Sequence, residues 1–216
     1  MSSTESPTPV VGLAIGALLF SIISMAYVLG SCGHVGKQQQ LLRDLHRAGI
    51  RMGAHTDLNE KLGLKENKAM GRFGTAAHYF NFPGGGFGVD DAGTLVFFSL
   101  VKSDNTSGAK AHALIRVRTT DGRDILNLSE EDFVQVYGRP SQGPDAIDSM
   151  ETGNGSGGVA LFSYYYDSGG KNIIHVSVAF EGDIGSRRVL QIVATLIEDE
   201  RANFLREHAD FRIFVP

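Results

Sequence analysis

The sequence predicts an α+β protein in which a single N-terminal transmembrane helix is followed by small antiparallel sheets packed with helices. Three patterns support this class: a charge-free apolar stretch at residues 10–29, a helical stripe of leucines at residues 37–48, and later segments with the two-residue period of strands. We expect four parts, which are a tail at 1–9, a transmembrane helix at 10–31, a helix-plus-sheet domain at 37–127 and a second α+β unit at 128–216.

The composition limits the possible functions. The chain has 216 residues, of which 42% are hydrophobic and 20% are charged, so it is too apolar for a disordered tail. Its formal net charge of −4 gives no overall attraction to nucleic acid. Cys32 is the single cysteine, which excludes an intramolecular disulfide framework and a cysteine-based zinc cluster.

The membrane prediction depends on residues 10–29. A helix of about 20 residues spans about 30 Å, which is the thickness of the hydrocarbon core of a bilayer. Pro7 and Pro9 precede the stretch, and Gly30 and Gly33 follow it, as expected at the two ends of a helix. We therefore expect an uncleaved single-pass anchor embedded in the lipid bilayer.

A second interpretation of the same stretch remains open. Residues 29–32 (Leu-Gly-Ser-Cys) are similar to a bacterial lipobox, in which Cys32 would carry a lipid after cleavage. Against this, residues 1–9 carry Glu5 and no basic side chain, and the apolar run exceeds the roughly 7–15 residues of a signal-peptide core. An envelope lipoprotein that is anchored through Cys32 and supports outer-membrane assembly is therefore the alternative.

Two further features concern the anchor. No basic residue precedes the anchor, and the nearest ones after it are Lys37, Arg43, Arg47 and Arg51. By the positive-inside rule this distribution favours a cytosolic soluble domain. Gly12 and Gly16 have the spacing at which two membrane helices pack closely, but glycine is also common in membrane helices generally. Packing through Gly12 and Gly16 is therefore one of two open interpretations.

The first soluble unit has a helical start followed by strand patterns. Aromatic and β-branched residues separated by Gly, Asp and Asn clusters predict three antiparallel strands on which the first helix lies. The expected elements are helices at 37–48 and 57–62 and strands at 76–82, 95–102 and 112–119.

The second unit begins at Ser129, whose acidic followers fit a helix N-cap. Gly138 and Pro140 end that helix, and residues 141–158 form a flexible glycine-rich loop. The rest of the unit is expected to contain a hairpin of strands 161–166 and 173–180, a strand at 188–196 for which helical spacing fits almost as well, a helix at 198–208 and a short strand at 211–215.

The motifs that would indicate chemistry are incomplete. The glycine-rich residues 83–88 lack the spacing and the following helix of a dinucleotide-binding loop, so we expect a hairpin loop there. The seven histidines show no ligand-pair spacing, and no serine lies in a nucleophile elbow. We therefore predict no enzyme, no catalytic, cofactor-binding or metal-binding residues, and no cofactor.

Three consecutive tyrosines lie in a predicted strand. Because side chains alternate across a strand, Tyr165 points away from the side that Tyr164 and Tyr166 share. This arrangement either places aromatic rings on an interaction surface or packs them against a helix.

Residues 10–126 resemble a family that comprises cytochrome c oxidase assembly factors and the regulatory subunit of the mitochondrial presequence translocase. The resemblance rests on the layout of one membrane helix, an amphipathic helix and a small antiparallel sheet. Its short motifs are Leu62-Gly63, Gly71, the strand at 95–98 and the turn at 108–111. The glycine loop at 83–88 departs from that family. The residues after 127 resemble small outer-membrane-assembly lipoprotein modules more loosely.

The resemblance implies a single-pass protein whose soluble domain lies on the extracytoplasmic side, slightly favoured over the cytosolic side. The function we predict is that of a non-enzymatic accessory or assembly protein that binds a membrane protein complex, such as a respiratory complex, and no nucleic acid. Tethering raises the effective concentration of a modest binding surface near its partner.

Overall fold

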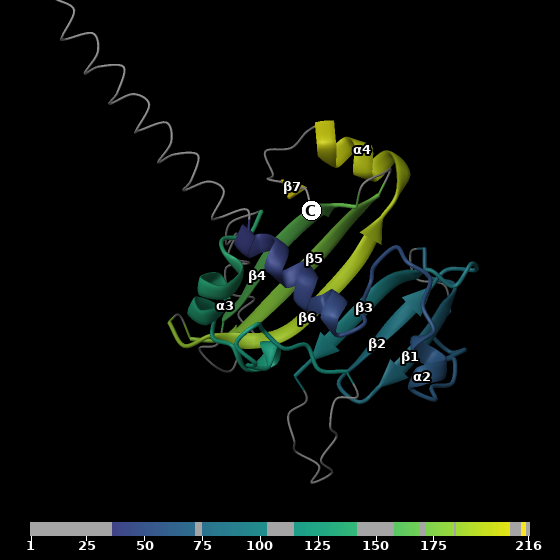
Figure 1. Cartoon of the computed structure of the whole chain (residues 1–216), viewed down its shortest axis with the longest axis horizontal. Helices are drawn as coiled ribbons and strands as arrows, with labels where there is room; N and C mark the ends of the chain where they lie inside the picture. The colour runs from purple at the N-terminus through teal and green to yellow at the C-terminus, as the bar shows by residue number, and fades with distance from the viewer. Residues whose placement is uncertain are drawn as a thin grey trace, which may run out of the picture. The chain divides into compact units, whose positions relative to one another are not determined.

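The computed structural model describes residues 36–71, 75–102, 115–141, 158–168, 172–183, 185–207 and 213–214. Its centre is one seven-stranded mixed sheet with the strand order β1-β2-β3-β6-β5-β4-β7 (Figure 1). The strands are β1 (His78–Phe82), β2 (Gly85–Val89), β3 (Leu95–Val101), β4 (Gly158–Asp167), β5 (Ile173–Gly182), β6 (Arg188–Ile197) and β7 (Ile213–Phe214). The helices are an N-terminal helix at residues 36–47, α2 (Leu58–Lys61), the 3-10 helix η1 (Ile125–Asn127), α3 (Glu130–Tyr137) and α4 (Asp199–Glu207).

The strand order contains the same arrangement twice. The N-terminal helix precedes the antiparallel meander β1-β2-β3, and α3 precedes the antiparallel meander β4-β5-β6. β3 then pairs with β6, so the two meanders join edge to edge into one sheet. The prediction of separate small antiparallel sheets is therefore wrong, since one sheet contains the strands of both halves and includes the parallel pair β4–β7.

The predicted single-pass membrane architecture is also corrected. Among the described residues, no helix is both long and apolar enough to cross a bilayer. The membrane fold class and the single-pass localisation are therefore wrong for the chain that the structure describes. Residues 10–31, on which the prediction depended, lie outside the described residues, as do Gly12, Gly16 and Cys32.

Several local predictions are confirmed. The hairpin is β4–β5, the ambiguous segment is strand β6, and the late helix and short strand are α4 and β7. Ser129 caps α3, because its hydroxyl accepts a hydrogen bond from the Asp132 N–H at 3.1 Å. The predicted loop at 141–158 falls mostly outside the described residues.

Two local predictions are wrong. The described part of the predicted strand 112–119 joins the sheet nowhere and forms only an isolated bridge between Arg118 and Asp124. The glycine-rich segment 83–88 is not a loop, because β2 begins at Gly85 and the turn consists of Pro83 and Gly84 alone. Gly84 has a φ of +83°, which glycine adopts without strain, and proline before it suits a tight turn.

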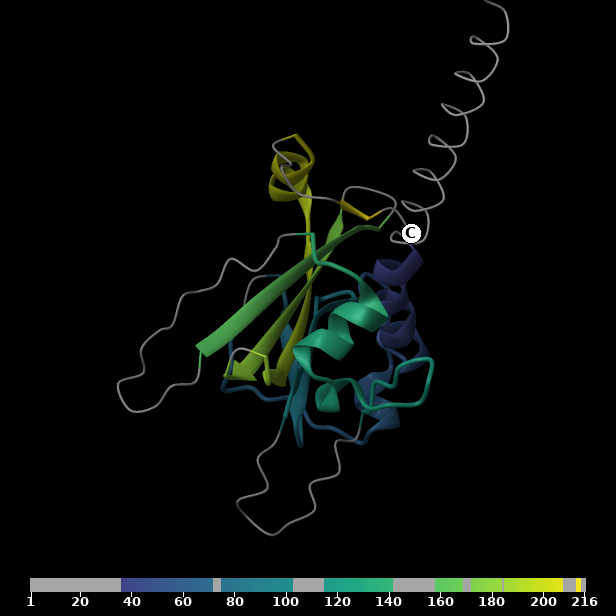
Figure 2. The same cartoon turned by 90° about the vertical axis from the view of Figure 1, so that its left-hand side faces the viewer.

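The N-terminal helix and α3, each of which precedes one meander, cover one face of the sheet. Figure 2 shows the N-terminal helix and α3 on the same side of the strands. Leucines of the N-terminal helix and Phe133 of α3 belong to the same buried cluster as inward residues of both meanders, such as Phe98 and Val178. This cluster is the hydrophobic core, and it lies between the sheet and the two helices.

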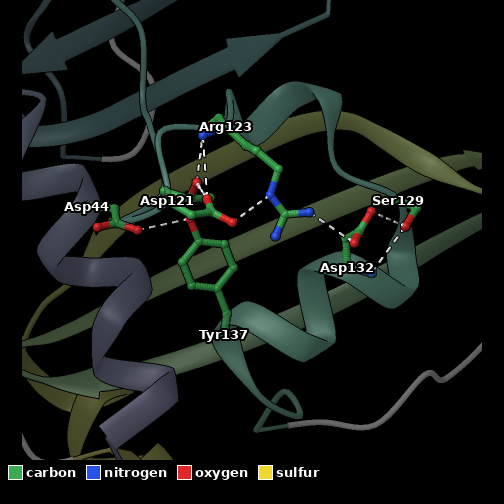
Figure 3. A network of polar contacts seen from close by, with 7 residues as sticks. Asp44, Asp121, Arg123, Ser129, Asp132 and Tyr137 are labelled. Carbon is green, nitrogen blue, oxygen red and sulfur yellow. Dashed lines mark hydrogen bonds and ion pairs between the residues drawn. The ribbon is translucent and has the colours of Figure 1, made fainter.

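A buried polar network fixes the two helices to each other (Figure 3). The Tyr137 hydroxyl of α3 donates to the Asp44 carboxylate of the N-terminal helix at 3.1 Å, and Gln40 donates to the same carboxylate at 2.6 Å. Burial raises the pKa of Asp44, while the hydrogen bonds from Gln40 and Tyr137 and the nearby Arg47 oppose that rise. The covered face is therefore held in place by both apolar packing and charge-assisted hydrogen bonds.

Candidate binding face

The second face of the sheet carries the side chains that alternate with the core residues. The strand register places these side chains in rows that cross the sheet, and three central rows lie between the row Asp167–Ile173–Ile197 at the α4 end and the row Val159–Glu181–Arg188 at the opposite end. The first row is Tyr79, Gly88, Phe97, Thr195, His175 and Tyr165; the second is Asn81, Gly86, Ser99, Val193, Ser177 and Ser163; the third is Val101, Gln191, Ala179 and Leu161. We call this set of residues the open face.

The open face contains no Lys, Arg, Asp or Glu in any of its three rows. Most of its side chains are partly exposed, in contrast with the buried neighbours of the core face. The outward side chains of a solvated antiparallel sheet are normally polar, and on the open face every polar side chain other than His175 is one that carries no charge. A charge-free, partly exposed face is therefore a candidate interaction surface.

The α4 end of the sheet limits the open face. Arg206 of α4 lies 3.4 Å from the Asp167 carboxylate and donates to the Asn172 carbonyl at 3.2 Å. Ile173, which pairs with Asp167, is fully buried there. Beyond this end, Tyr165 and Leu161 of β4 are partly exposed, whereas Ser163 between them is buried.

Aromatic rings are concentrated in the first row. The rings of Tyr79 and Phe97 lie 5.7 Å apart, and those of Tyr165 and His175 stack with centroids 4.6 Å apart. The structure separates the members of the tyrosine triplet. Tyr164 and Tyr166 are fully buried in the core cluster, whereas Tyr165 lies on the open face.

A hollow of about 450 Å³ opens at the β1–β3 end of this face. Its lining residues are uncharged, and they are Met70, Tyr79, Asn81, Gly84, Gly85, Gly86, Phe97, Ser99 and Val101. Gly86 and Gly88 of β2 lack side chains on this face, and the Tyr79 ring lies so close to Gly88 that a Cβ there would come within 3.2 Å of it. Met70 and Val101, at 51% and 36% exposure, are two of the exposed large hydrophobic residues in the described chain.

One pair on the open face has the residue types of a catalytic dyad. His175 Nε2 lies 3.1 Å from Ser163 Oγ. However, Ser163 is only 9% exposed and lies on a flat strand, whereas a serine nucleophile is typically presented on a sharp turn beside oxyanion donors. The contact is therefore better described as a diagonal cross-strand hydrogen bond.

The histidines and the glycine-rich segment, for which the sequence predicts no site, lie as follows in the described part of the chain. No group of three or more His, Cys, Asp or Glu side chains there is arranged to hold a metal ion. His78 contacts Glu66 at 2.8 Å in an exposed pair. Gly84, Gly85 and Gly86 line the hollow, and the segment continues into strand β2 instead of opening a helix, so it does not form a phosphate-binding loop.

Sequence reasoning missed the open face, although a signal for it exists. Gly84, Gly86 and Gly88 recur every second residue, which in a strand places all three on one face. The register between β3 and β6, which brings the two halves of the open face together, has no local signal, because it joins residues 90 to 98 positions apart.

No family model, curated protein or solved structure matches the chain. The resemblance to oxidase assembly factors therefore stays a prediction.

Proposed function

We propose that this chain is a non-enzymatic accessory protein that binds a protein partner on the open face of its sheet. The observation that carries the proposal is the absence of charged side chains from the three central rows of a partly exposed face, whose charged residues Glu181, Arg188 and Asp167 lie in the two flanking rows. A protein partner with a neutral, largely apolar surface fits such a face, because burying it leaves no charge without a counter-charge.

The composition of the open face supports a protein in preference to nucleic acid. Single-stranded nucleic acid also stacks on aromatic rows, but it needs basic side chains along the backbone path. The open face has tyrosine and phenylalanine rings and no Lys or Arg. Aromatic residues with few charges are typical of the centre of protein interfaces.

Two matched glutamine-to-lysine variants test the proposal. Gln191 lies on the open face in β6, and Gln135 is exposed on α3, which covers the other face. We expect Gln191→Lys to abolish capture of specific partners from a lysate of the source cells, because it buries an unpaired charge in the interface. Gln135→Lys is expected to capture the same partners as the unmodified protein.

The comparison has clear opposing outcomes. Partners lost with Gln191→Lys and retained with Gln135→Lys support the open face as the docking surface. Equal capture by both variants, or no specific capture by the unmodified protein, contradicts the proposal. Unfolding curves of both variants show whether either loss reflects a change in fold.

A further inference from the structure

The two long edges of the sheet differ in protection. At the β1 edge, the Asn67 N–H donates to the Tyr79 carbonyl at 2.7 Å and Glu66 forms a bridge with Phe80. At the β4 edge, β7 pairs only with Tyr165 and Tyr166. Among the described residues, no strand pairs with the outer edge of β4 at residues 159–163, which we call the β4 edge segment.

The hydrogen bonds near this segment show which main-chain groups point outward. The Ser163 carbonyl accepts from the Ser141 N–H at 2.9 Å, and that bond lies on the side of β4 away from β5. In an antiparallel ladder the N–H and C=O of one residue point to the same side, and the side alternates along the strand. The N–H and C=O groups of Val159 and Leu161 therefore also point outward.

The β4 edge segment lacks the features that normally block strand addition. Exposed edges are usually protected by lysine, proline, charged side chains or a bulge. Residues 159–163 read Val-Ala-Leu-Phe-Ser, their pairing with β5 is regular, and Val159 is 39% exposed. The chain itself shows that this edge accepts a strand, because β7 pairs in parallel beside Tyr165.

We propose that the β4 edge segment binds an extended segment of a polypeptide partner as an added strand. The inference rests on the proposed function, and it adds the conformation in which the partner binds. Outward N–H and C=O groups that recur every second residue match the main chain of an extended peptide. An added strand would carry the rows of the open face beyond Leu161 and Ser163, so that its alternate side chains lie on the same surface.

A random 12-residue peptide display library, selected on the full-length protein, supplies the probe. We expect a selected peptide to lose binding when N-methyl groups are placed at every second position and to keep it when they occupy the intervening positions. Each blocked main-chain hydrogen bond is expected to weaken binding by about tenfold. Uniform sensitivity to N-methylation, insensitivity to it, or the absence of selected peptides overturns the inference.

A proline substitution in β4 locates the site on the protein. Leu161→Pro removes an outward N–H from an edge strand, a position that tolerates proline, so we expect folding to persist and peptide binding to fall at least about tenfold. Gln135→Lys, which changes an exposed residue of α3, serves as the folded reference. Should Leu161→Pro fail to fold, slowed hydrogen exchange at the Leu161 amide of the unmodified protein on peptide addition gives the same answer.

The outcomes separate this inference from the proposed function. Binding that is lost with Gln191→Lys and unchanged with Leu161→Pro overturns strand addition and leaves the open face as a docking surface. Binding that neither substitution changes overturns both. A dimer of the isolated protein that Leu161→Pro dissociates identifies a second copy of the chain as the occupant and overturns the inference of a different partner.

Discussion

Three fully buried tyrosines allow one kind of substitution to measure how much the hydrogen bond between Tyr137 and Asp44 contributes to the free energy of unfolding. Tyr137 donates to the Asp44 carboxylate at 3.1 Å, whereas Tyr164 and Tyr166 donate to the main-chain carbonyls of Gly138 and Gln38 at 3.0 and 2.8 Å. Replacement of each tyrosine by phenylalanine removes one hydroxyl and keeps the buried ring. The three variants therefore differ mainly in the charge of the acceptor that loses its donor.

The expected losses follow from that charge. A hydrogen bond to a neutral acceptor contributes about 0.5–1.5 kcal/mol to the free energy of unfolding, and one to a charged acceptor contributes about 1.5–3 kcal/mol. We expect Tyr166→Phe and Tyr164→Phe to cost about 1 kcal/mol each and Tyr137→Phe to cost about 2 kcal/mol, because Asp44 is fully buried.

Urea denaturation at pH 7 measures these losses, provided that the slope with denaturant concentration stays constant. A double-mutant cycle of Tyr137→Phe with Asp44→Asn tests the specific pair, and we expect a coupling of about 1 kcal/mol. A cost for Tyr137→Phe no larger than that for Tyr166→Phe, together with no coupling to Asp44→Asn, would refute the assignment of a charge-assisted bond between the two helices.

Three shorter predictions concern pH, capping and the close approach of strands. Burial raises the folded-state pKa of Asp44 above its ordinary value of about 3.9. The free energy of unfolding therefore falls as the pH rises from about 3.9 through the raised pKa, because the buried carboxyl group ionises over that range. Asp44→Asn should remove this part of the pH dependence of the unfolding free energy. Ser129→Ala should cost about 1 kcal/mol in a urea titration, because the N–H of Asp132 loses its cap, and a neutral result would contradict the capping role. Gly85→Ala should prevent folding or lower the melting temperature strongly, because the new Cβ would lie 2.2 Å from the Ser99 carbonyl oxygen; an unchanged melting temperature would show that the strands separate easily there.

The local elements were predictable wherever a short-range signal exists. Ser129 and Gly138 mark the two ends of α3, and the alternation around Tyr165 correctly separates its side chain from those of its neighbours. These features depend on hydrogen bonds and periodicities within a few residues. The candidate site itself was not predicted.

The joining of the two halves depends on long-range pairing. Both halves show the pattern of a helix followed by strands, but nothing near Phe98 or Ala194 specifies that β3 and β6 are neighbours. Backbone hydrogen bonds are the same for every strand pair, so the choice depends on the global packing of the core. The segment 83–88 was misassigned for a related reason, since glycine weakens strand propensity and close packing against Ser99 and Tyr79 outweighs that weakness.

The alternation along each strand makes the open face experimentally separable from the fold. Core stability depends on residues such as Val178 and Ile192, whereas Ala179 and Gln191 on the same two strands carry no part of the core cluster. Substitutions of Ala179 and Gln191 therefore leave the packing beneath both helices intact, whereas Tyr79 of the open face belongs to the core cluster and Phe97 packs against it. Such substitutions are also free of the usual cost of removing a surface charge pair, because the open face holds no charged residue. A loss of binding in these variants with an unchanged unfolding free energy is consequently attributable to the surface itself.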